Sequence, residues 1–476
     1  MKITLIISAL LTLVSCNKTL EQNHKDLSLN QIINTNEDVL TDFIEVPENR
    51  SKKNGKKIEL AYTVIKALNK NSKKAPLVYL QGGPGGPTLI MENAFKNTPY
   101  HNDRDIILMD QRGTGISNAI CADYGNNLIQ VLAKDLSPEE EYRELRKILV
   151  HCKMEATSKN IDLSAYNSRE NAADFEDLRK HLGYDQFNLF GESYGSRLGL
   201  TIMRDFPKSV RSAILTGVFP PEINFYENLV GNFKQSLFEV FKVCDNDADC
   251  NTKYPDIKTD FLNVINLLNK EPYTFKFNNG DFVLNTQDVL LMLHQMLYRR
   301  STIEQIPSFI KAIETKNDDV IRNSLRPAMG TISFINFAMY MSVNAYDELA
   351  FNGVKESVKD LKNNSELIVA PAYFGSDARL LEEWHSFRAK PYENKPVISN
   401  IPTLIANGRL DPITPPGNAL LAAKHLENSF YIEFEADGHG VSFTPCFFEF
   451  SLEFLDNPEV QPDFSCVNMN TDIQWK

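Results

Sequence analysis

The feature that most constrains the fold is a short apolar run that enters a Gly-x-Ser-x-Gly turn and leaves it as an apolar-periodic segment. The run is Phe187–Phe190, the turn is Gly191-Glu-Ser-Tyr-Gly195, and the segment is Arg197–Met203. This order predicts a strand, a very tight turn and a helix, because two glycines let the strand and helix backbones come close. Ser193 is then expected to stand exposed at the end of the strand as a nucleophile. The alternative is a glycine-rich turn without chemistry.

Two backbone N–H groups are candidates for stabilising the oxyanion that forms when Ser193 attacks a carbonyl. One is the amide of Tyr194, at the start of the helix. The other belongs to Gly83, in the loop Gln81-Gly-Gly-Pro-Gly-Gly86 that follows the apolar run Leu77–Leu80. This loop lacks both the Gly-Lys-Ser/Thr ending of a phosphate loop and the spacing of a dinucleotide fingerprint. The alternative for Gly83 is a plain tight turn.

A serine nucleophile needs a base, and the base needs an orienting acid. Asp411 follows the buried run Thr403–Ala406, and His439 lies in the loop after the next strand. The imidazole can accept the proton of Ser193 and return it to the leaving group, while Asp411 fixes its tautomer. Asp437 is a rival acid, although its position two residues before His439 favours a role in shaping the turn.

The surrounding pattern predicts a mostly parallel, doubly wound sheet. Short β-rich runs precede Ser193, at 44–46, 58–65, 77–80 and 106–109. A helix is expected over Ser168–Leu182, with Gly183 as its stop. The motif Asp110-Gln-Arg-Gly-Thr-Gly-Ile-Ser117 follows a buried strand. Its charges Asp110 and Arg112 are candidates for a catalytic role, but they are expected instead to tie that loop together through hydrogen bonds and a salt bridge. Alternating strands and helices of this kind are typical of an α/β fold.

From about residue 220 to about 395 the pattern is largely helical, with little strand-like alternation, and strands resume afterwards. The sequence therefore predicts an α/β core formed by residues 39–219 and 397–476, with a helical cap at 220–396 inserted between them. The net charge of −12, without a concentrated Lys/Arg block, argues against a nucleic-acid partner.

The N-terminal sequence and the cysteines both predict export. Residues 1–16 read as a secretory signal, and residues 17–38 as a flexible tether. The even number of cysteines after Cys16 suggests disulfides, and sequence proximity favours Cys121–Cys152, Cys244–Cys250 and Cys446–Cys466. No Cys-x-x-Cys or His-x-x-x-His spacing accompanies them, so a metal site is not expected.

Four motifs together resemble the proline iminopeptidase and tripeptidyl aminopeptidase family of serine peptidases: 81–86, 110–117, 191–195 and 438–440. The resemblance implies an α/β-hydrolase fold, a helical cap, no metal or other cofactor, and the release of residues from the N-termini of peptide substrates. The chain has Gln81 where the family usually carries His. The segment Cys446–Cys466 resembles the C-terminal extension of the tripeptidyl branch.

Two further resemblances concern recognition of the substrate N-terminus and the N-terminal segment of this protein. The segment Met339–Phe351 resembles the cap segment where relatives place an acidic residue near the substrate amine, which makes Glu348, then Asp347, the candidates. The alternative is that both are solvated charges on a helix. Leu13-Val-Ser-Cys16 resembles a bacterial lipobox, which implies cleavage before Cys16, lipidation of its thiol and attachment to a membrane through the lipid alone.

Three functions are compatible with these motifs: an exported exopeptidase acting on peptide N-termini, an esterase or amidase using the same triad on small molecules, and a non-catalytic binding lipoprotein. The presence of Ser193, Asp411 and His439 together argues against the third, because binding gives no reason to retain all three. The motifs do not separate the first two, since one fold and one triad serve both.

Overall fold

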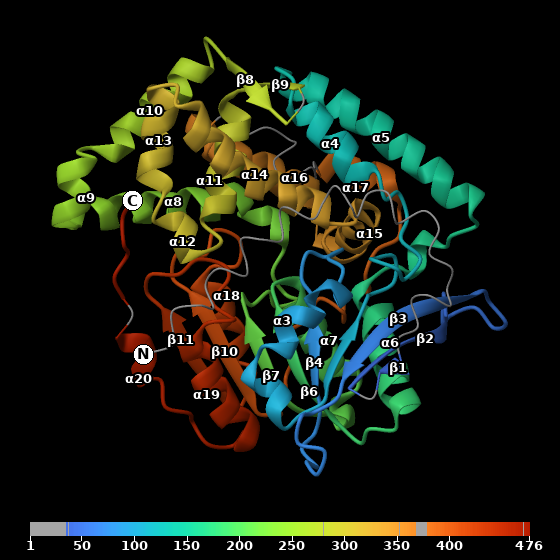
Figure 1. The fold of residues 1–476 in the computed structure, drawn as a ribbon. Coiled ribbons are helices and arrows are strands. Elements are labelled where there is room, and N and C mark those ends of the chain that lie inside the picture. The colour runs from blue at the N-terminus through green and yellow to red at the C-terminus, as the bar shows by residue number, and fades with distance from the viewer. Residues whose placement is uncertain (1–34, 37, 279, 352, 368–377, 470) are drawn as a thin grey trace.

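One sheet of nine strands organises the described part of the chain, in the order β1-β2-β3-β5-β4-β6-β7-β10-β11 (Figure 1). The computed structural model describes residues 35–476 apart from 37, 279, 352, 368–377 and 470. The expected signal peptide, Cys16 and most of the expected tether lie outside these residues. The strands are β1 (Thr35–Asn36), β2 (Val39–Pro47), β3 (Lys57–Ile65), β4 (Leu77–Leu80), β5 (Ile106–Met109), β6 (Phe187–Glu192), β7 (Val210–Thr216), β10 (Thr403–Gly408) and β11 (Ser429–Phe434).

The sheet is parallel from β5 to β11 and antiparallel at the β1–β3 edge. Every residue of β4 and β5 is buried, as the uninterrupted apolar runs predict for parallel strands covered on both faces. Helices α6 (Ser168–Leu182), α7 (Tyr194–Asp205) and α18 (Pro416–Ala423) pack on one face. Helices α3 (Glu92–Lys96) and α19 (Pro445–Asp456) cover the other. The expected α/β-hydrolase architecture is confirmed.

Helix α6 has the bounds that the sequence predicts. Its N-cap Asn167 accepts the N–H of Glu170 at 3.0 Å, and Gly183 ends it with φ +75°. Both devices satisfy helix-end groups that would otherwise lose their partners. The first turn of α6 is therefore fixed in place, and it carries residues that matter at the site described below.

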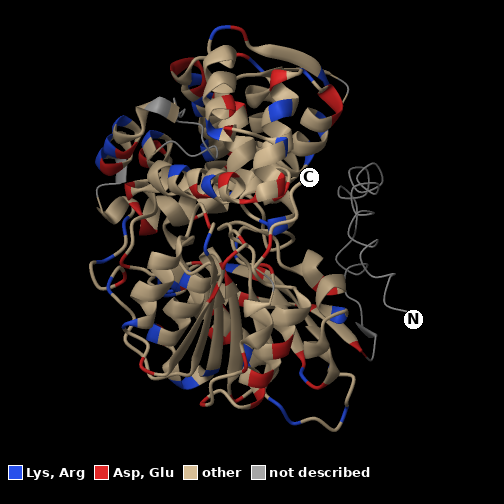
Figure 2. Ribbon diagram, turned by 90° about the vertical axis from the view of Figure 1, so that its left-hand side faces the viewer, with Lys and Arg blue, Asp and Glu red and all other residues tan. Residues whose placement is uncertain are grey.

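The segment between β7 and β10 forms a helical layer at one end of the strands (Figures 1 and 2). Its helices are α8 (Leu229–Asn246), α9 (Ala248–Lys253), α10 (Ile257–Leu268), α11 (Thr286–Met296), α12 (Arg300–Ile303), α13 (Ile306–Glu314), α14 (Asp318–Phe334), α15 (Phe337–Asp347), α16 (Gly353–Asn363) and α17 (Ala378–Trp384). Charged residues of both signs are interspersed over this layer and over the core below it (Figure 2).

The inserted segment is largely helical, as expected, but it also contains a hairpin that is not among the strands expected from the sequence. Strands β8 (Tyr273–Phe277) and β9 (Gly280–Leu284) pair antiparallel. Phe275 and Phe277 are buried while Lys276 between them is exposed, which is the period-2 pattern of a half-buried strand. The alternation is short, and its location between two helical stretches hid it.

A second difference concerns two helices that precede the turn carrying Ser193. Helices α4 (Tyr124–Leu132) and α5 (Pro138–Ser158) lie in the stretch that the sequence assigns to the core, yet they pack against α14 and α17 of the inserted segment (Figure 1). The ring of Tyr124 stacks on Phe337 of α15 at 5.2 Å between centroids. The helical layer is therefore built from two separate stretches of the chain.

The cysteines are joined in the three pairs that sequence proximity favours. Cys121–Cys152 ties α5 to the loop after β5, Cys244–Cys250 links α8 to α9, and Cys446–Cys466 links α19 to α20 (Ser465–Asn468). No helix in the described part of the chain is both long and apolar enough to cross a membrane.

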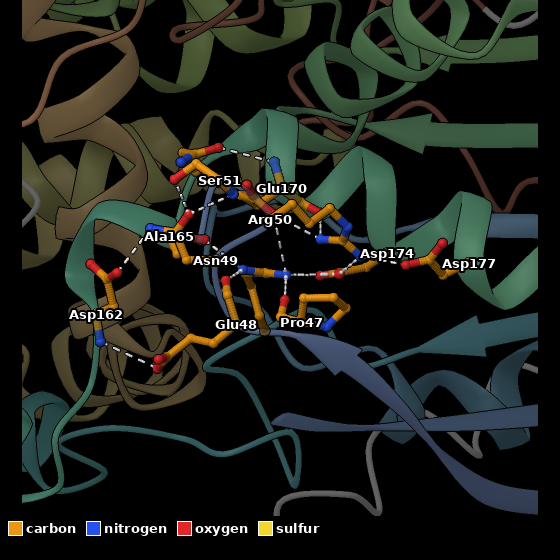
Figure 3. A network of polar contacts seen from close by, with 12 residues as sticks. Pro47, Glu48, Asn49, Arg50, Ser51, Asp162, Ala165, Glu170, Asp174 and Asp177 are labelled. Carbon is orange, nitrogen blue, oxygen red and sulfur yellow. Dashed lines mark hydrogen bonds and ion pairs between the residues drawn. The ribbon is translucent and has the colours of Figure 1, made fainter. Parts of the chain in front are cut away.

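A buried ionic network holds the loop after β5 against α6 (Figure 3). The Arg112 side chain is fully buried; its Nε and Nη2 donate to the two oxygens of Asp174 at 2.8 and 2.7 Å. Arg50 approaches Asp174 from the other side at 2.7 Å and also binds Glu170 at 2.8 Å. Because two guanidinium groups share these carboxylates, the buried charges are compensated.

Asp110 closes the same loop from within. Its carboxylate accepts three backbone N–H groups, from Thr88 at 2.6 Å, Leu89 at 2.9 Å and Ile116 at 3.0 Å. Burial raises the pKa of Asp110, and these hydrogen bonds oppose the rise. The structure thus confirms that Asp110 and Arg112 tie the loop together, and the residue between them, Gln111, is fixed as a result.

Candidate active site

Ser193 lies in a strained turn between β6 and α7. Its backbone has φ 59° and ψ −127°, and its N–H donates to the carbonyl of Thr216 on β7 at 2.9 Å. A Cβ on Gly195 would stand 1.9 Å from the carbonyl oxygen of Leu80, and one on Gly191 would stand 2.3 Å from that of Gly195. Only glycine fits at either position. The Ser193 side chain is half-buried while Tyr194 after it is buried, so the turn presents the serine.

Asp411 and His439 are hydrogen-bonded to each other. His439 Nδ1 and Asp411 Oδ2 are 2.9 Å apart, and the two residues are 4% and 0% exposed. The other carboxylate oxygen, Oδ1, accepts the N–H groups of Ile413 and Thr414 at 2.8 and 2.9 Å. This arrangement leaves the lone pair of a neutral imidazole on Nε2.

Sequence reasoning missed Thr414. Its hydroxyl donates to Asp411 Oδ2 at 2.6 Å and lies 3.1 Å from His439 Nδ1. It therefore fixes the carboxylate that orients the imidazole. A Thr three residues after an Asp, in a turn that contains two prolines, is a local signal for this kind of capping.

The pKa of His439 reflects two opposed effects. Burial lowers it, but the charge and hydrogen bond of Asp411, together with the charge of Glu192, more than offset burial and leave the pKa raised. The ring of Tyr298, just after α11, packs edge-on against the imidazole at 4.8 Å between centroids. The N–H of Gly440 also donates to the Tyr298 carbonyl at 2.7 Å. The helical layer thus forms one wall around His439.

The structure brings the loops of Ser193 and His439 together. Ser193 is bonded to Thr216, and a Cβ on the next residue, Gly217, would stand 2.9 Å from His439 Cε1. The hydroxyl of Ser442, three residues after His439, donates to the carboxylate of Glu192, which precedes Ser193. The two loops therefore meet directly as well as through β7.

The glycine loop after β4 lies on the other side of Ser193. A Cβ on Gly82 would stand 2.9 Å from Ser193 Cβ, so this residue passes directly against the serine. Gly83 follows with φ +120° and is exposed. The loop is held by the helical layer, because the N–H of Asn336 at the start of α15 donates to the carbonyl of Gly85 at 2.9 Å. It is also held by Gln111, whose Nε2 donates to the carbonyl of Gln81 at 2.9 Å.

Asp347 and Glu348 are buried, so the alternative that they are solvated charges is wrong. Glu348 Oε1 lies 2.9 Å from Arg197 Nη1, and its Oε2 accepts the N–H of Phe225 at 2.7 Å. Burial raises the pKa of Glu348 to about 7, against the opposing charge of Arg197. Asp347 Oδ2 lies 3.8 Å from Arg197 Nε and accepts the hydroxyl of Ser168. Arg197 is one helical turn after Ser193, so both carboxylates contact the first turns of the helix that follows Ser193.

The rival acid, Asp437, is engaged elsewhere. Its carboxylate forms an ion pair with Arg300 at the start of α12. That pairing links the turn before His439 to the helical layer. No group of three or more His, Cys, Asp or Glu side chains in the described residues is arranged to hold a metal ion.

Sequence comparison with known proteins identifies the same fold that the sheet shows. A family model of the alpha/beta hydrolase fold matches residues 75–248, and a model described as TAP-like protein matches residues 373–466. The sheet and the first match define the class of protein: it is an α/β-hydrolase.

Curated proteins with similar sequences indicate which α/β-hydrolases this protein is related to. A probable proline iminopeptidase of Leptolyngbya boryana is 28% identical over 162 residues, 34% of this chain and 37% of that protein. A tripeptidyl aminopeptidase of Streptomyces lividans is 27% identical over 188 residues, 38% of this chain and 35% of that protein. These matches span little more than a third of the relatives' length. Together with the TAP-like match, they show that the chain is related to the proline iminopeptidases and tripeptidyl aminopeptidases.

A solved structure of an α/β-hydrolase enzyme from a Medee basin deep-sea metagenome library aligns over 86% of this chain and 97% of that one. Its TM-score is 0.40 and its sequence identity 13%.

The Asp411–His439 pair predicts a titration that NMR can measure. Because the folded pKa of His439 is raised, its protonated form stabilises the fold. That contribution is complete below the ordinary imidazole pKa of about 6.5 and disappears as pH rises through the folded value. Asp411→Asn should lower the pKa of His439, whereas the control Asp437→Asn should leave it nearly unchanged. A larger shift in the control would make Asp437 the partner of His439.

Proposed function

We propose that the protein is an exported serine exopeptidase that removes residues from the N-termini of peptides through Ser193, His439 and Asp411. The observation that carries the proposal is the meeting of the strained Ser193 turn with the Asp411–His439 pair at the ends of parallel strands. The names of the curated relatives supply the peptide substrate and the N-terminal position of cleavage.

In this mechanism Ser193 Oγ attacks the scissile carbonyl carbon while its proton passes to His439 Nε2. The carbonyl electrons move to the oxygen, where the N–H groups of Tyr194 and Gly83 stabilise the oxyanion. Collapse releases the amine, which takes the proton from His439, and leaves an acyl-enzyme. Water then attacks the acyl carbon by the same route and regenerates Ser193. Asp411 holds the imidazole in the required tautomer throughout.

The alternative is an esterase or amidase that uses the same three residues on small molecules. A feature that favours the peptidase is the buried carboxylate pair next to Arg197, because an exopeptidase must recognise a charged α-ammonium group. In our proposal, Glu348 binds this group and Asp347 assists. Since Arg197 contacts one oxygen of Glu348, an incoming amine shares the carboxylate with that guanidinium.

Glu222 is a further acidic residue for the same role. It lies in the loop after β7, between Phe219, whose N–H donates to Ser196 Oγ, and Phe225, whose N–H donates to Glu348. Both of its carboxylate oxygens are buried, with no hydrogen-bond partner among the described residues. A buried carboxylate of this kind is costly unless a cation compensates it.

Disulfides that join all six of the later cysteines are consistent with an extracellular protein. In our proposal the chain is a bacterial lipoprotein that remains on the outer side of a membrane through the lipid on Cys16.

Ser193→Ala should reduce turnover of a peptide amide by at least about a thousandfold without unfolding the protein, because the covalent path is lost. The matched control is Ser212→Ala, which removes a buried hydroxyl bonded to Asn188 on β6, at the opposite end of the strand from Ser193. Steady-state kinetics and thermal melting test the pair. Turnover of Ser193→Ala within about tenfold of wild type would exclude Ser193 as the nucleophile.

Glu348→Gln should lower kcat/KM for peptides with a free N-terminus by about 2–4 kcal/mol, as loss of a buried charged contact does. A small ester without an amine should be hydrolysed almost normally. Asp360→Asn is the control, because this carboxylate also lies buried in the helical layer and accepts backbone N–H groups of Val230 and Gly231.

Equal losses on both substrates, or no loss on either, would remove Glu348 from the amine site. A selective loss in Glu222→Gln alone would move the site to that residue.

Cys16→Ser should release the protein from membranes, because the lipid is the proposed anchor. Fractionation and metabolic labelling with a radioactive fatty acid measure the two consequences: the wild-type chain should take up label and sediment with membranes, and the variant should do neither. A variant that still sediments would show that another part of the protein attaches it.

A further inference from the structure

A hydrogen-bonded chain of buried side chains connects Tyr194, the residue after Ser193, to Gln81, the first residue of the glycine loop. Asn171 on α6 stands at its centre. Its Nδ2 lies 3.1 Å from the hydroxyl of Tyr194 and 3.4 Å from Oε1 of Gln111. Gln111 Nε2 in turn donates to the carbonyl of Gln81 at 2.9 Å. The side-chain amide of Asn171 is therefore linked to the Ser193 turn through Tyr194 and to the glycine loop through Gln111.

The other end of this hydrogen-bonded chain lies in the helical layer. The hydroxyl of Ser168, one turn before Asn171, donates to Asp347 at the end of α15 and lies 3.0 Å from the hydroxyl of Tyr194. Because an ionised carboxylate only accepts, the proton of Ser168 goes to Asp347, and Tyr194 donates to Ser168 while it accepts from Asn171. The direction of each hydrogen bond is then fixed, from Asn171 through Tyr194 and Ser168 to Asp347.

Burial makes this chain rigid. The exposed fractions of Ser168, Asn171, Tyr194, Gln111 and Asp347 are 4, 1, 3, 1 and 3%. Without water to compete, each hydrogen bond is strong and each side chain is held in one rotamer. The backbone segments that carry this hydrogen-bonded chain are also fixed, since Asn167 caps α6 and the Arg112–Asp174 pair holds the loop that carries Gln111.

The chain spans the two backbone segments that carry the proposed oxyanion donors. Tyr194 supplies one N–H itself, and Gln81 is two residues before Gly83, which supplies the other. The distance between the two donors must match an oxygen about 2.7–3.1 Å from each. Those donors follow two paired strands, β4 and β6, whose last paired residues are Leu80 and Gly191. Beyond that pair, the spacing of the two donors depends on the packing of the loops and on the side chains that connect them.

We propose that Asn171 is a positioning residue that sets the spacing of the two oxyanion donors, through Tyr194 on one side and Gln111 on the other. This inference rests on the proposed role of Ser193 as the nucleophile. Asp347 has a second role in it, because it anchors the chain to α15.

The side-chain hydrogen bonds of Asn171 run through its Nδ2 group. Asn171 Oδ1 is buried without a hydrogen-bond partner among the described residues. An unsatisfied buried carbonyl destabilises a fold, but an apolar side chain at this position would leave Gln111 Oε1 and the Tyr194 hydroxyl without their Asn171 donor. A polar residue kept at such a position is explained by what its N–H groups do.

The experiment compares Tyr194→Phe and Asn171→Ala with two matched controls. Tyr100→Phe also removes a fully buried hydroxyl, which is bonded to Ser451. Asn188→Ala also removes a fully buried amide, at the opposite end of β6 from Ser193. We expect kcat to fall about tenfold in Tyr194→Phe and about ten- to a hundredfold in Asn171→Ala, with KM within about twofold, because misplaced catalytic groups lose rate rather than binding. The controls should lose stability but not kcat.

A second measurement separates positioning from general damage. A peptidyl trifluoromethyl ketone adds Ser193 Oγ to its carbonyl carbon, sends the serine proton to His439 and places the resulting oxyanion on the two donors. Its inhibition constant should rise by the same factor as kcat falls. A peptide alcohol of the same sequence, which forms no oxyanion, should bind almost unchanged. The double variant Tyr194→Phe/Asn171→Ala should be no worse than the poorer single variant, because both break one chain.

Each outcome decides between the two proposals. Labelling of Ser193 by a fluorophosphonate, together with unchanged kcat in both variants, would overturn the positioning role and leave the proposed function standing. Equal loss of affinity for ketone and alcohol, or a loss of kcat matched by the controls, would also overturn it. Absence of labelling in the wild-type protein would instead overturn the proposed function.

Discussion

The structure depends on one close backbone contact, between the start of α7 and the end of β4. Gly195 lies so near the carbonyl of Leu80 that any side chain would collide with it. This contact brings the Ser193 turn and the glycine loop after β4 against each other, because the loop begins at the very next residue. Two glycines of one motif therefore position a second motif that lies more than a hundred residues earlier in the chain.

Buried polar groups connect the core to the helical layer. Arg197 on α7 lies between Asp347 and Glu348, Arg300 binds Asp437 next to His439, and Asn336 binds the carbonyl of Gly85. Apolar packing would hold two surfaces together without fixing their register, whereas hydrogen bonds and ion pairs of this kind are satisfied in one arrangement only. Each of these contacts reaches a loop that carries a candidate site residue, so the helical layer and the site share one geometry.

The sequence predicts most of the core, because its signals are local. Uninterrupted apolar runs predict the parallel strands, and α6 begins and ends where its capping residues indicate. The order Ser193, Asp411, His439 and the pairing of the last two follow from residues at strand ends. These features need only neighbours in the chain, so a single sequence is enough to find them.

What the sequence does not predict depends on distant contacts. The packing of α4 and α5 against α14 and α17 has no local signature, and the short hairpin β8–β9 is surrounded by helical pattern. The burial of Glu348 depends on its ion pair with Arg197, which lies far away in the sequence. Asn171 reads as one polar residue in an amphipathic helix, and only the fold places it between Tyr194 and Gln111.

The division between features that the local sequence predicts and features that depend on distant contacts matches a division of chemical roles. The residues that we propose to react with the substrate lie in short motifs with strained or glycine-dependent backbones, and such motifs tolerate few alternatives. Residues that adjust them are ordinary polar side chains held by tertiary packing, and the energy of each depends on partners from other elements. Asn171 combines an Nδ2 group that donates to Tyr194 and Gln111 with a carbonyl oxygen that has no partner among the described residues. In our proposal, these two hydrogen bonds connect the segments that carry the two oxyanion donors, so a polar side chain held by tertiary packing sets the geometry of residues that short motifs supply.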